Sequence, residues 1–119
     1  WPERGEIKFI DFFVKYRPNL DPVLRGLSVT FAAGEKIGIV GRTGSGKSTI
    51  MMSLLRILES FKGQILIDGK DIAKMSLDDL RSAITNILQD PCLFAGTLRE
   101  VLFIPLRTWI PWTSILMTI

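Results

Sequence analysis

The stretch that decides the fold is a glycine-rich run, Gly41-Arg42-Thr43-Gly44-Ser45-Gly46-Lys47-Ser48-Thr49. It fits the pattern G-x-x-x-x-G-K-[ST], in which glycines let consecutive backbone N–H groups curl into an anion-binding concavity. Residues 36–40 before it (Lys-Ile-Gly-Ile-Val) are mostly apolar and predict a buried strand. Residues 48–58 after it carry Met and Leu at three- and four-residue spacing and predict a helix. The order strand, loop, helix places an anion at the positive end of a helix, so the sequence predicts a phosphate-binding loop.

Two side chains of this run are candidates for chemistry. Lys47 is expected to reach the outer phosphates of a nucleotide, which makes it the candidate catalytic residue, and the Ser48 hydroxyl is expected to face Mg²⁺. The alternative is a flexible glycine loop that merely begins a helix. A flexible loop would need neither the preceding apolar strand nor the Gly-Lys-Ser order, yet the sequence has both. Nucleotide phosphate binding explains both features and is therefore the better interpretation.

Composition limits the other function classes. The chain has 119 residues, enough for one domain at most, and 47% of them are hydrophobic, which is ample for a core. The net charge is +3, but Lys and Arg are scattered along the chain, which favours a solvated surface over nucleic-acid binding. A single cysteine, Cys92, excludes an internal disulfide, and the absence of histidine excludes His-based catalysis and His metal ligation.

The remaining pattern predicts a short antiparallel sheet in the front third of the chain, which leads into a parallel α/β core. Residues 6–16 and 24–31 alternate as strands around a turn at 17–22, and a further strand at 63–67 is closed by the tight-turn pair Asp68-Gly69. Ser76, with a carboxylate three residues later, predicts a helix start, and residues 83–88 predict another strand. Thr97 is a candidate cap for a last helix.

Several separate stretches together resemble the nucleotide-binding domain of ATP-binding-cassette (ABC) transporters. They are Trp1-Pro2-Glu3-Arg4-Gly5, Tyr16-Arg17, residues 38–49, Ile65-Leu66-Ile67-Asp68-Gly69 and Leu88-Gln89-Asp90-Pro91. Their character is similar to the second nucleotide-binding domain of the multidrug-resistance-associated (subfamily C) exporters. The resemblance implies an α/β fold: a P-loop NTPase core with an N-terminal antiparallel β-subdomain, incomplete at its C-terminal half.

The resemblance also implies a site. Tyr16 would stack on adenine, the loop residues 41–49 would hold the phosphates, and Gln89 would contact Mg²⁺ and the attacking water. Alone, Tyr16 and Gln89 read as strand-end residues. We reject Asp68 as a Mg²⁺ ligand because a hairpin explains it. The implied cofactors are ATP and Mg²⁺, and the implied partners are a second nucleotide-binding domain and transmembrane domains. The parent would be an ATPase that exports organic anions, drugs or conjugates, with this chain at the cytoplasmic face of the membrane and no nucleic acid as partner.

The family pattern is expected to cover residues 1–100 and to give way to a divergent apolar tail over 101–119. Pro105, Arg107 and Pro111 interrupt that tail, which favours an irregular segment over a transmembrane helix. The chain begins without Met or a signal peptide, so we expect it to start inside a longer polypeptide. A truncated or frame-shifted reading and a genuine alternative C-terminus both remain open for the tail.

The chain also lacks a Leu-Ser-Gly-Gly-Gln signature, an apolar strand ending in Asp-Glu, and a switch histidine. We therefore expect the chain alone to bind nucleotide weakly and to hydrolyse it slowly. Two alternatives stay open: a non-hydrolysing nucleotide sensor or inactive fragment, and a soluble DNA-repair-type cassette ATPase. Tyr16 and the Asp68-Gly69 hairpin argue against the latter.

Overall fold

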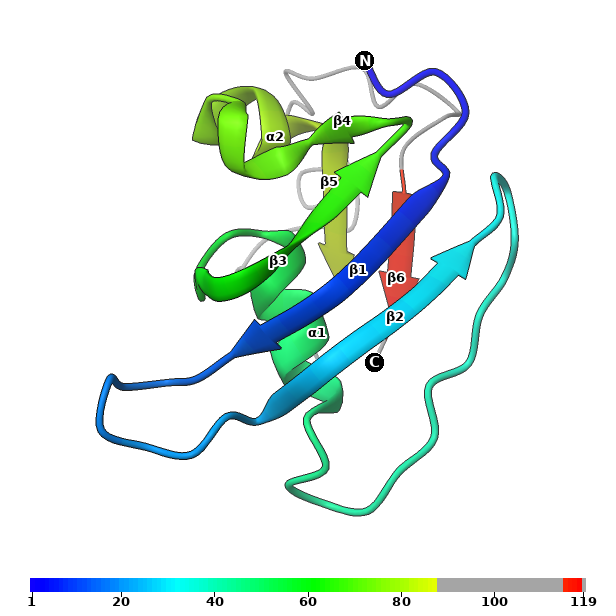
Figure 1. Cartoon of the computed structure of the whole chain (residues 1–119). Helices are drawn as coiled ribbons and strands as arrows, with labels where there is room; N and C mark the ends of the chain where they lie inside the picture. Colours follow the sequence, from blue (N-terminus) through cyan, green and yellow to red (C-terminus); the bar gives the residue numbers. More distant parts are fainter. Residues whose placement is uncertain (88–114, 119) are drawn as a thin grey trace, which may run out of the picture.

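A four-stranded antiparallel sheet forms the front of the molecule (Figure 1). The computed structural model describes residues 1–87 and 115–118. The strands are β1 (Ile7–Val14), β2 (Leu24–Phe31), β3 (Ser60–Ile67) and β4 (Lys70–Asp71), in the order β2-β1-β3-β4. The predicted antiparallel pair at the front is thus confirmed. The strand that follows the phosphate-loop helix joins the same sheet, beside β1.

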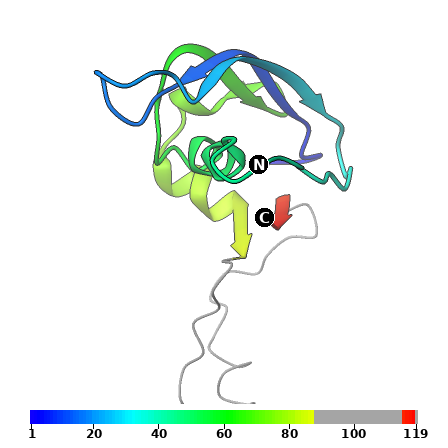
Figure 2. The ribbon, with the colours of Figure 1, turned by 90° about the horizontal axis from the view of Figure 1, so that it is seen from below.

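The inner face of the sheet packs on helix α1 (Lys47–Leu54), which lies beneath the curved strands in Figure 2. Strand β1 contributes four buried side chains to this core, listed as Ile7, Phe9, Phe12 and Val14. The alternation changes phase between Phe9 and Phe12, where the pairing with β2 also shifts register. Asp11 takes a positive φ of 44° at this irregularity, so both Phe9 and Phe12 face the core and meet edge to face.

Helix α1 ends earlier than the sequence predicted. We expected it to continue to Leu58, but it stops at Leu54 with Leu55 as the C-cap. Arg56 then takes a positive φ of 49°, its N–H donates to the Ser53 carbonyl, and the Ile57 N–H donates to the Met52 carbonyl. These are the two hydrogen bonds of a Schellman motif, here closed by arginine in place of glycine. The Arg56 guanidinium donates to the Ile72 and Met75 carbonyls, which fixes the residue in this unusual conformation.

The buried strand predicted at 36–40 is wrong for this structure. The segment forms no regular element, and Val40 is 97% exposed. A strand needs a neighbour for its backbone hydrogen bonds, and within residues 1–87 and 115–118 no strand pairs with this segment. A turn precedes it: the Glu35 N–H donates to the Ala32 carbonyl, and Gly34 has a φ of 72°.

Behind the sheet lie the 3₁₀ turn η1 (Ile72–Lys74), helix α2 (Leu77–Ala83) and a parallel pair of strands, β5 (Ile84–Ile87) and β6 (Ile115–Thr118). The predicted cap is confirmed, since the Ser76 hydroxyl accepts from the Asp79 N–H at 3.1 Å. The irregular tail is corrected at 115–118, where the apolar, partly β-branched run pairs with β5. The predictions on Gln89, Cys92 and Thr97 lie outside the described residues.

A carboxylate clamp ties the N-terminal segment to the β3–β4 hairpin. Asp68 and Gly69 both have positive φ, 48° and 76°, as a two-residue type I′ turn requires. The Asp68 carboxylate accepts hydrogen bonds from four successive backbone N–H groups, those of Glu3, Arg4, Gly5 and Glu6, at 2.8–3.1 Å. Burial alone would raise the pKa of Asp68, but these four donors outweigh it and lower the pKa to about 2.

Asp68→Asn is therefore expected to lower the free energy of unfolding by roughly 1–3 kcal/mol at neutral pH, because an amide cannot accept all four donors. The folded-state pKa lies below the ordinary value, so the carboxylate stabilises the fold above about pH 4 and ceases to do so as the pH falls toward 2. Urea denaturation at pH 7 and pH 2.5 measures both effects. The exposed Asp21→Asn is the matched control, and an equal loss in the two variants would contradict the clamp.

Candidate phosphate-binding site

The glycine-rich run forms a closed loop at the N-terminus of α1. The Ser45 N–H donates to the Arg42 carbonyl at 3.1 Å, and the Ile50 N–H donates to the Gly46 carbonyl at 3.2 Å as the helix begins. Gly44 and Gly46 take φ values of 80° and 93°, which L side chains rarely adopt. Arg42 and Thr43 are exposed at the tip. The chain reaches this loop from β2 by the long connection on the right of Figure 1.

The Lys47 ammonium lies inside the curl of the loop. Its Nζ donates to the Gly41 carbonyl at 2.7 Å and to the Arg42 carbonyl at 2.9 Å. An ammonium has three N–H donors. Two of them bind the Gly41 and Arg42 carbonyls, and the third is left for a ligand. The side chain is half-buried, and the first turn of α1 contains no acidic residue that would neutralise it. The loop therefore presents a positive charge at the positive end of a helix.

Two glycines of the motif lie close against neighbouring side chains. A Cβ on Gly46 would lie 3.2 Å from Leu24 and 3.3 Å from Val23, so this residue seats the loop on the start of β2. A Cβ on Gly41 would overlap the Ser45 side chain. The contact with Val23 and Leu24 was not foreseen from sequence, because it joins residues more than 20 positions apart and no local pattern signals it.

Tyr16, predicted to stack on adenine, follows the end of β1 and lies against α1. Its hydroxyl is 3.0 Å from the Thr49 hydroxyl oxygen, and its side chain is 47% exposed. Thr49 is buried, and its carbonyl accepts from the Ser53 hydroxyl. The fold thus brings Tyr16 to the first turns of the phosphate-loop helix, across 33 residues of sequence. The Tyr16–Thr49 contact adds a structural role that the sequence did not reveal.

Ser48, predicted to face Mg²⁺, lies exposed on the first turn of α1. No group of three or more Cys, Asp or Glu side chains suited to a metal ion occurs in the described part of the chain. A serine hydroxyl beside phosphate oxygens is the arrangement in which Mg²⁺ binds with few protein ligands. The donor set therefore fits Mg²⁺ only together with a nucleotide. Asp68, with its carboxylate filled by four backbone donors, is no alternative ligand.

In a comparison with protein-family models, residues 24–112 match the model described as ABC transporter. Among curated proteins, the chain is 59% identical over 99 residues to ATP-binding cassette sub-family C member 3 of Homo sapiens. It is 56% identical over 99 residues to sub-family C member 2 of Rattus norvegicus. It is also 56% identical over 100 residues to ABC transporter C family member 3 of Dictyostelium discoideum.

These alignments cover 83–84% of the chain but only 6–7% of the relatives' own length. Among solved structures, a bacterial Atm1-family ABC exporter with ATP bound matches with a TM-score of 0.76 and 38% identity. That match covers 84% of this chain and 18% of the exporter chain. Within the residues that the structure describes, no helix is long and apolar enough to span a bilayer. The division at residue 100 stays a prediction.

Proposed function

Since this chain belongs to the ABC transporter family, we propose that it forms the ATP-binding part of an ATPase domain in a membrane exporter. The observation that carries the proposal is the loop closed around the Lys47 ammonium at the N-terminus of α1. A glycine-rich loop at a helix N-terminus, closed on one fixed cation, suits a polyphosphate better than it suits a monoanion, because the cation and the backbone N–H donors are spread along the loop.

Each part of the site has a role in this proposal. The backbone from Gly41 to Thr49 holds the phosphates, and the third N–H of the Lys47 ammonium donates to their outer oxygens. The Ser48 hydroxyl would hold Mg²⁺ together with those oxygens, and Gln89 would assist it. Bound ATP supplies the phosphoanhydride bond whose cleavage drives transport. Lys47 acts as the catalytic residue by neutralising charge, and it needs no change in protonation to do so.

The parent protein is proposed from the relatives. The similarity to members of sub-family C and to the Atm1-family exporter supports the proposal that the parent transports its cargo across a membrane. This domain would lie at the cytoplasmic face. Its partners would be transmembrane domains and another nucleotide-binding domain, with this chain as the second of the two. Organic anions, drugs or conjugates are the proposed cargo, by likeness to subfamily C alone.

Tyr16→Ala is expected to weaken ATP binding about tenfold and to leave tripolyphosphate binding unchanged, because base stacking contributes roughly 1–3 kcal/mol. Titration calorimetry with both ligands measures this difference. Tyr16→Phe is the matched control: it keeps the ring and removes the hydroxyl that meets Thr49. Equal weakening of ATP and tripolyphosphate in Tyr16→Ala would show that Tyr16 only supports the helix. Equal weakening of ATP by both variants would assign the effect to the hydroxyl.

A further inference from the structure

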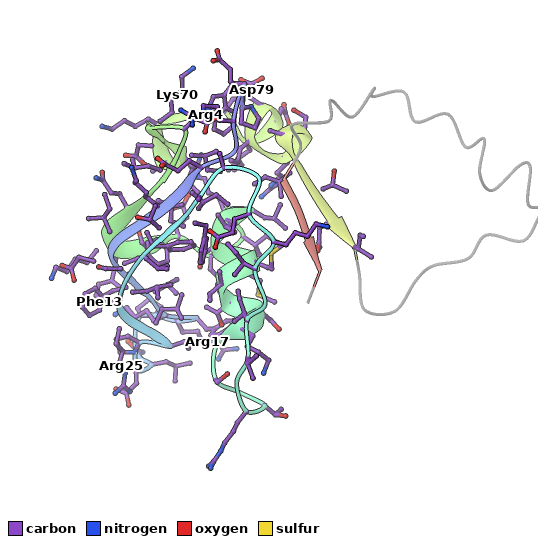
Figure 3. All side chains as sticks on the ribbon, turned by 90° about the vertical axis from the view of Figure 1, so that its right-hand side faces the viewer. Arg4, Phe13, Arg17, Arg25, Lys70 and Asp79 are labelled. Carbon is purple, nitrogen blue, oxygen red and sulfur yellow. The ribbon has the colours of Figure 1, made fainter. Side chains whose placement is uncertain are left out.

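The outer face of the sheet carries a row of cations and aromatic rings, away from the phosphate loop. Phe13 on β1 is paired with Arg25 on β2 and with Lys62 on β3, so these three side chains share one face across three strands. Figure 3 shows Phe13 and Arg25 on the side of the sheet that faces away from α1. Helix α1 covers the inner face of the sheet, and among the described residues no helix covers this outer face.

Two rings and two ammonium groups interlock on this face. The Phe13 and Phe61 rings are 5.9 Å apart between centroids. Lys62 Nζ lies 4.8 Å from the centre of the Phe13 ring, and Lys15 Nζ lies 5.0 Å from the centre of the Phe61 ring. Phe61 is 52% exposed. We call these residues, Phe13, Lys15, Arg25, Phe61 and Lys62, the cation–aromatic patch.

The patch is held in place before any partner binds. A Cβ on Gly26 would lie 3.2 Å from the tip of the Phe13 ring, so the tip of the ring rests against this glycine. Asp11 is the carboxylate beside the patch, and it is paired with Lys62 at 2.7 Å. Three cations against one anion leave the patch with a net positive charge, which is complementary to an acidic partner.

The strand beside the patch has an open edge. Strand β4 pairs with β3 only at Leu66 and Ile67, so among the described residues no strand pairs with the outer edge of Ser60–Ile65. Below this edge lies a pocket of about 320 Å³ between β3, η1 and the end of α1. Its lining is mixed: Phe12, Leu58, Ile65 and Ile72 supply the apolar part, and Arg56, Glu59 and Asp71 supply charged groups. An edge strand with a pocket beside it is the arrangement in which proteins bind extended peptides by strand addition.

We propose that the β3 edge and the cation–aromatic patch form a docking site for an extended peptide in which acidic and apolar residues alternate. Alternate side chains of a strand point to opposite faces of the sheet. The acidic side chains of the added strand therefore meet Lys15 and Lys62 on the outer face, while its apolar side chains enter the pocket on the inner face. The partner is an acidic segment of a protein.

Two features favour a peptide over a nucleic acid or an anionic membrane. The open edge of β3 offers backbone N–H and C=O groups, which pair with a polypeptide backbone and have no counterpart in a phosphodiester chain or a lipid headgroup. The Asp11 carboxylate lies beside the cations and repels a dense row of phosphates. A peptide with one carboxylate at every second residue tolerates that charge.

The test uses the full chain and a labelled peptide, acetyl-Glu-Leu-Glu-Val-Glu-Leu-Glu-amide, with fluorescence anisotropy as the readout. We expect saturable binding that weakens at least about tenfold between 50 and 500 mM salt. The same peptide with Lys in place of Glu is expected not to bind. No saturable binding of the acidic peptide at 1 mM overturns the proposal. Tighter binding of a single-stranded oligonucleotide or of anionic lipid vesicles at the same lysines also overturns it.

Charge variants locate the site. Lys15→Glu and Lys62→Glu are each expected to weaken the peptide about tenfold, and Asp11→Asn to strengthen it about threefold. Lys70→Glu, with the same charge change at the far end of the hairpin, is the matched control and is expected to have little effect. Thermal melting of each variant confirms the fold. Asp11→Asn is expected to strengthen peptide binding, whereas damage to the fold would weaken it. This variant therefore tests the proposal even if Lys62→Glu unfolds the protein. Equal effects of Lys15→Glu and Lys70→Glu, or weaker binding by Asp11→Asn, would overturn the proposal.

Discussion

The Lys47→Ala variant is expected to lose the thermal stabilisation that Mg-ATP gives to the unmutated chain. At a ligand concentration of 100 times Kd, binding adds about 2.7 kcal/mol to the free energy of unfolding. The Lys47 ammonium is the one charge enclosed by the described part of the loop, held by the Gly41 and Arg42 carbonyls. Removing it takes away roughly 2–4 kcal/mol of binding free energy, which leaves less than about 1 kcal/mol of the stabilisation at that concentration.

Differential scanning fluorimetry with and without Mg-ATP measures this loss. Lys36→Ala is the control, because Lys36 is an exposed lysine on the same connection and lies outside the loop. Lys47→Ala also removes two internal hydrogen bonds, so each variant is compared with its own ligand-free melting temperature. An unmutated chain that gains no stability from Mg-ATP would count against a competent site. An unchanged gain in Lys47→Ala would count against the role of the ammonium.

Several features of the fold were predictable because they depend on neighbouring residues. The turn at Asp68-Gly69 needs two consecutive residues that tolerate positive φ, and the sequence states them directly. The cap of α2 is likewise a local exchange between Ser76 and Asp79. The phosphate loop belongs to the same class, since its curl follows from the spacing of its glycines and from the Lys47 side chain.

What the sequence did not predict depends on distant parts of the chain. The segment 36–40 has the composition of a buried strand, but a strand forms only against a neighbour, and the described residues provide none there. Helix α1 stops at Leu54 because Arg56 is anchored to carbonyls of η1 and of Met75, about 20 residues further on. The Asp68 clamp was missed for the same reason, since its four donors lie more than 60 residues away in sequence.

Gly63→Ala is expected to lower the free energy of unfolding more than Asp68→Asn or Gly69→Ala does, because strands β1 and β3 meet at Gly63 without space for a side chain. A Cβ at this position would overlap backbone atoms of Ile10 and Asp11, which cannot rotate away as a side chain can. Gly63 also has a φ of 81°, which costs an L residue about 1–2 kcal/mol by itself. The strands must separate locally, so we expect a total loss of at least about 3 kcal/mol.

Gly69→Ala separates the two causes. Gly69 has a nearly equal φ of 76°, but nothing lies within 4 Å of a Cβ there. It therefore carries the backbone strain alone, and its expected cost is about 1–2 kcal/mol. Urea denaturation midpoints of the two variants, taken at equal slope, give the difference directly. A clearly larger loss in Gly63→Ala means that the close approach of Asp11 to β3 is real in solution. Equal losses would mean that the strands relax around the methyl group and that the bulge at Asp11 is not tightly packed.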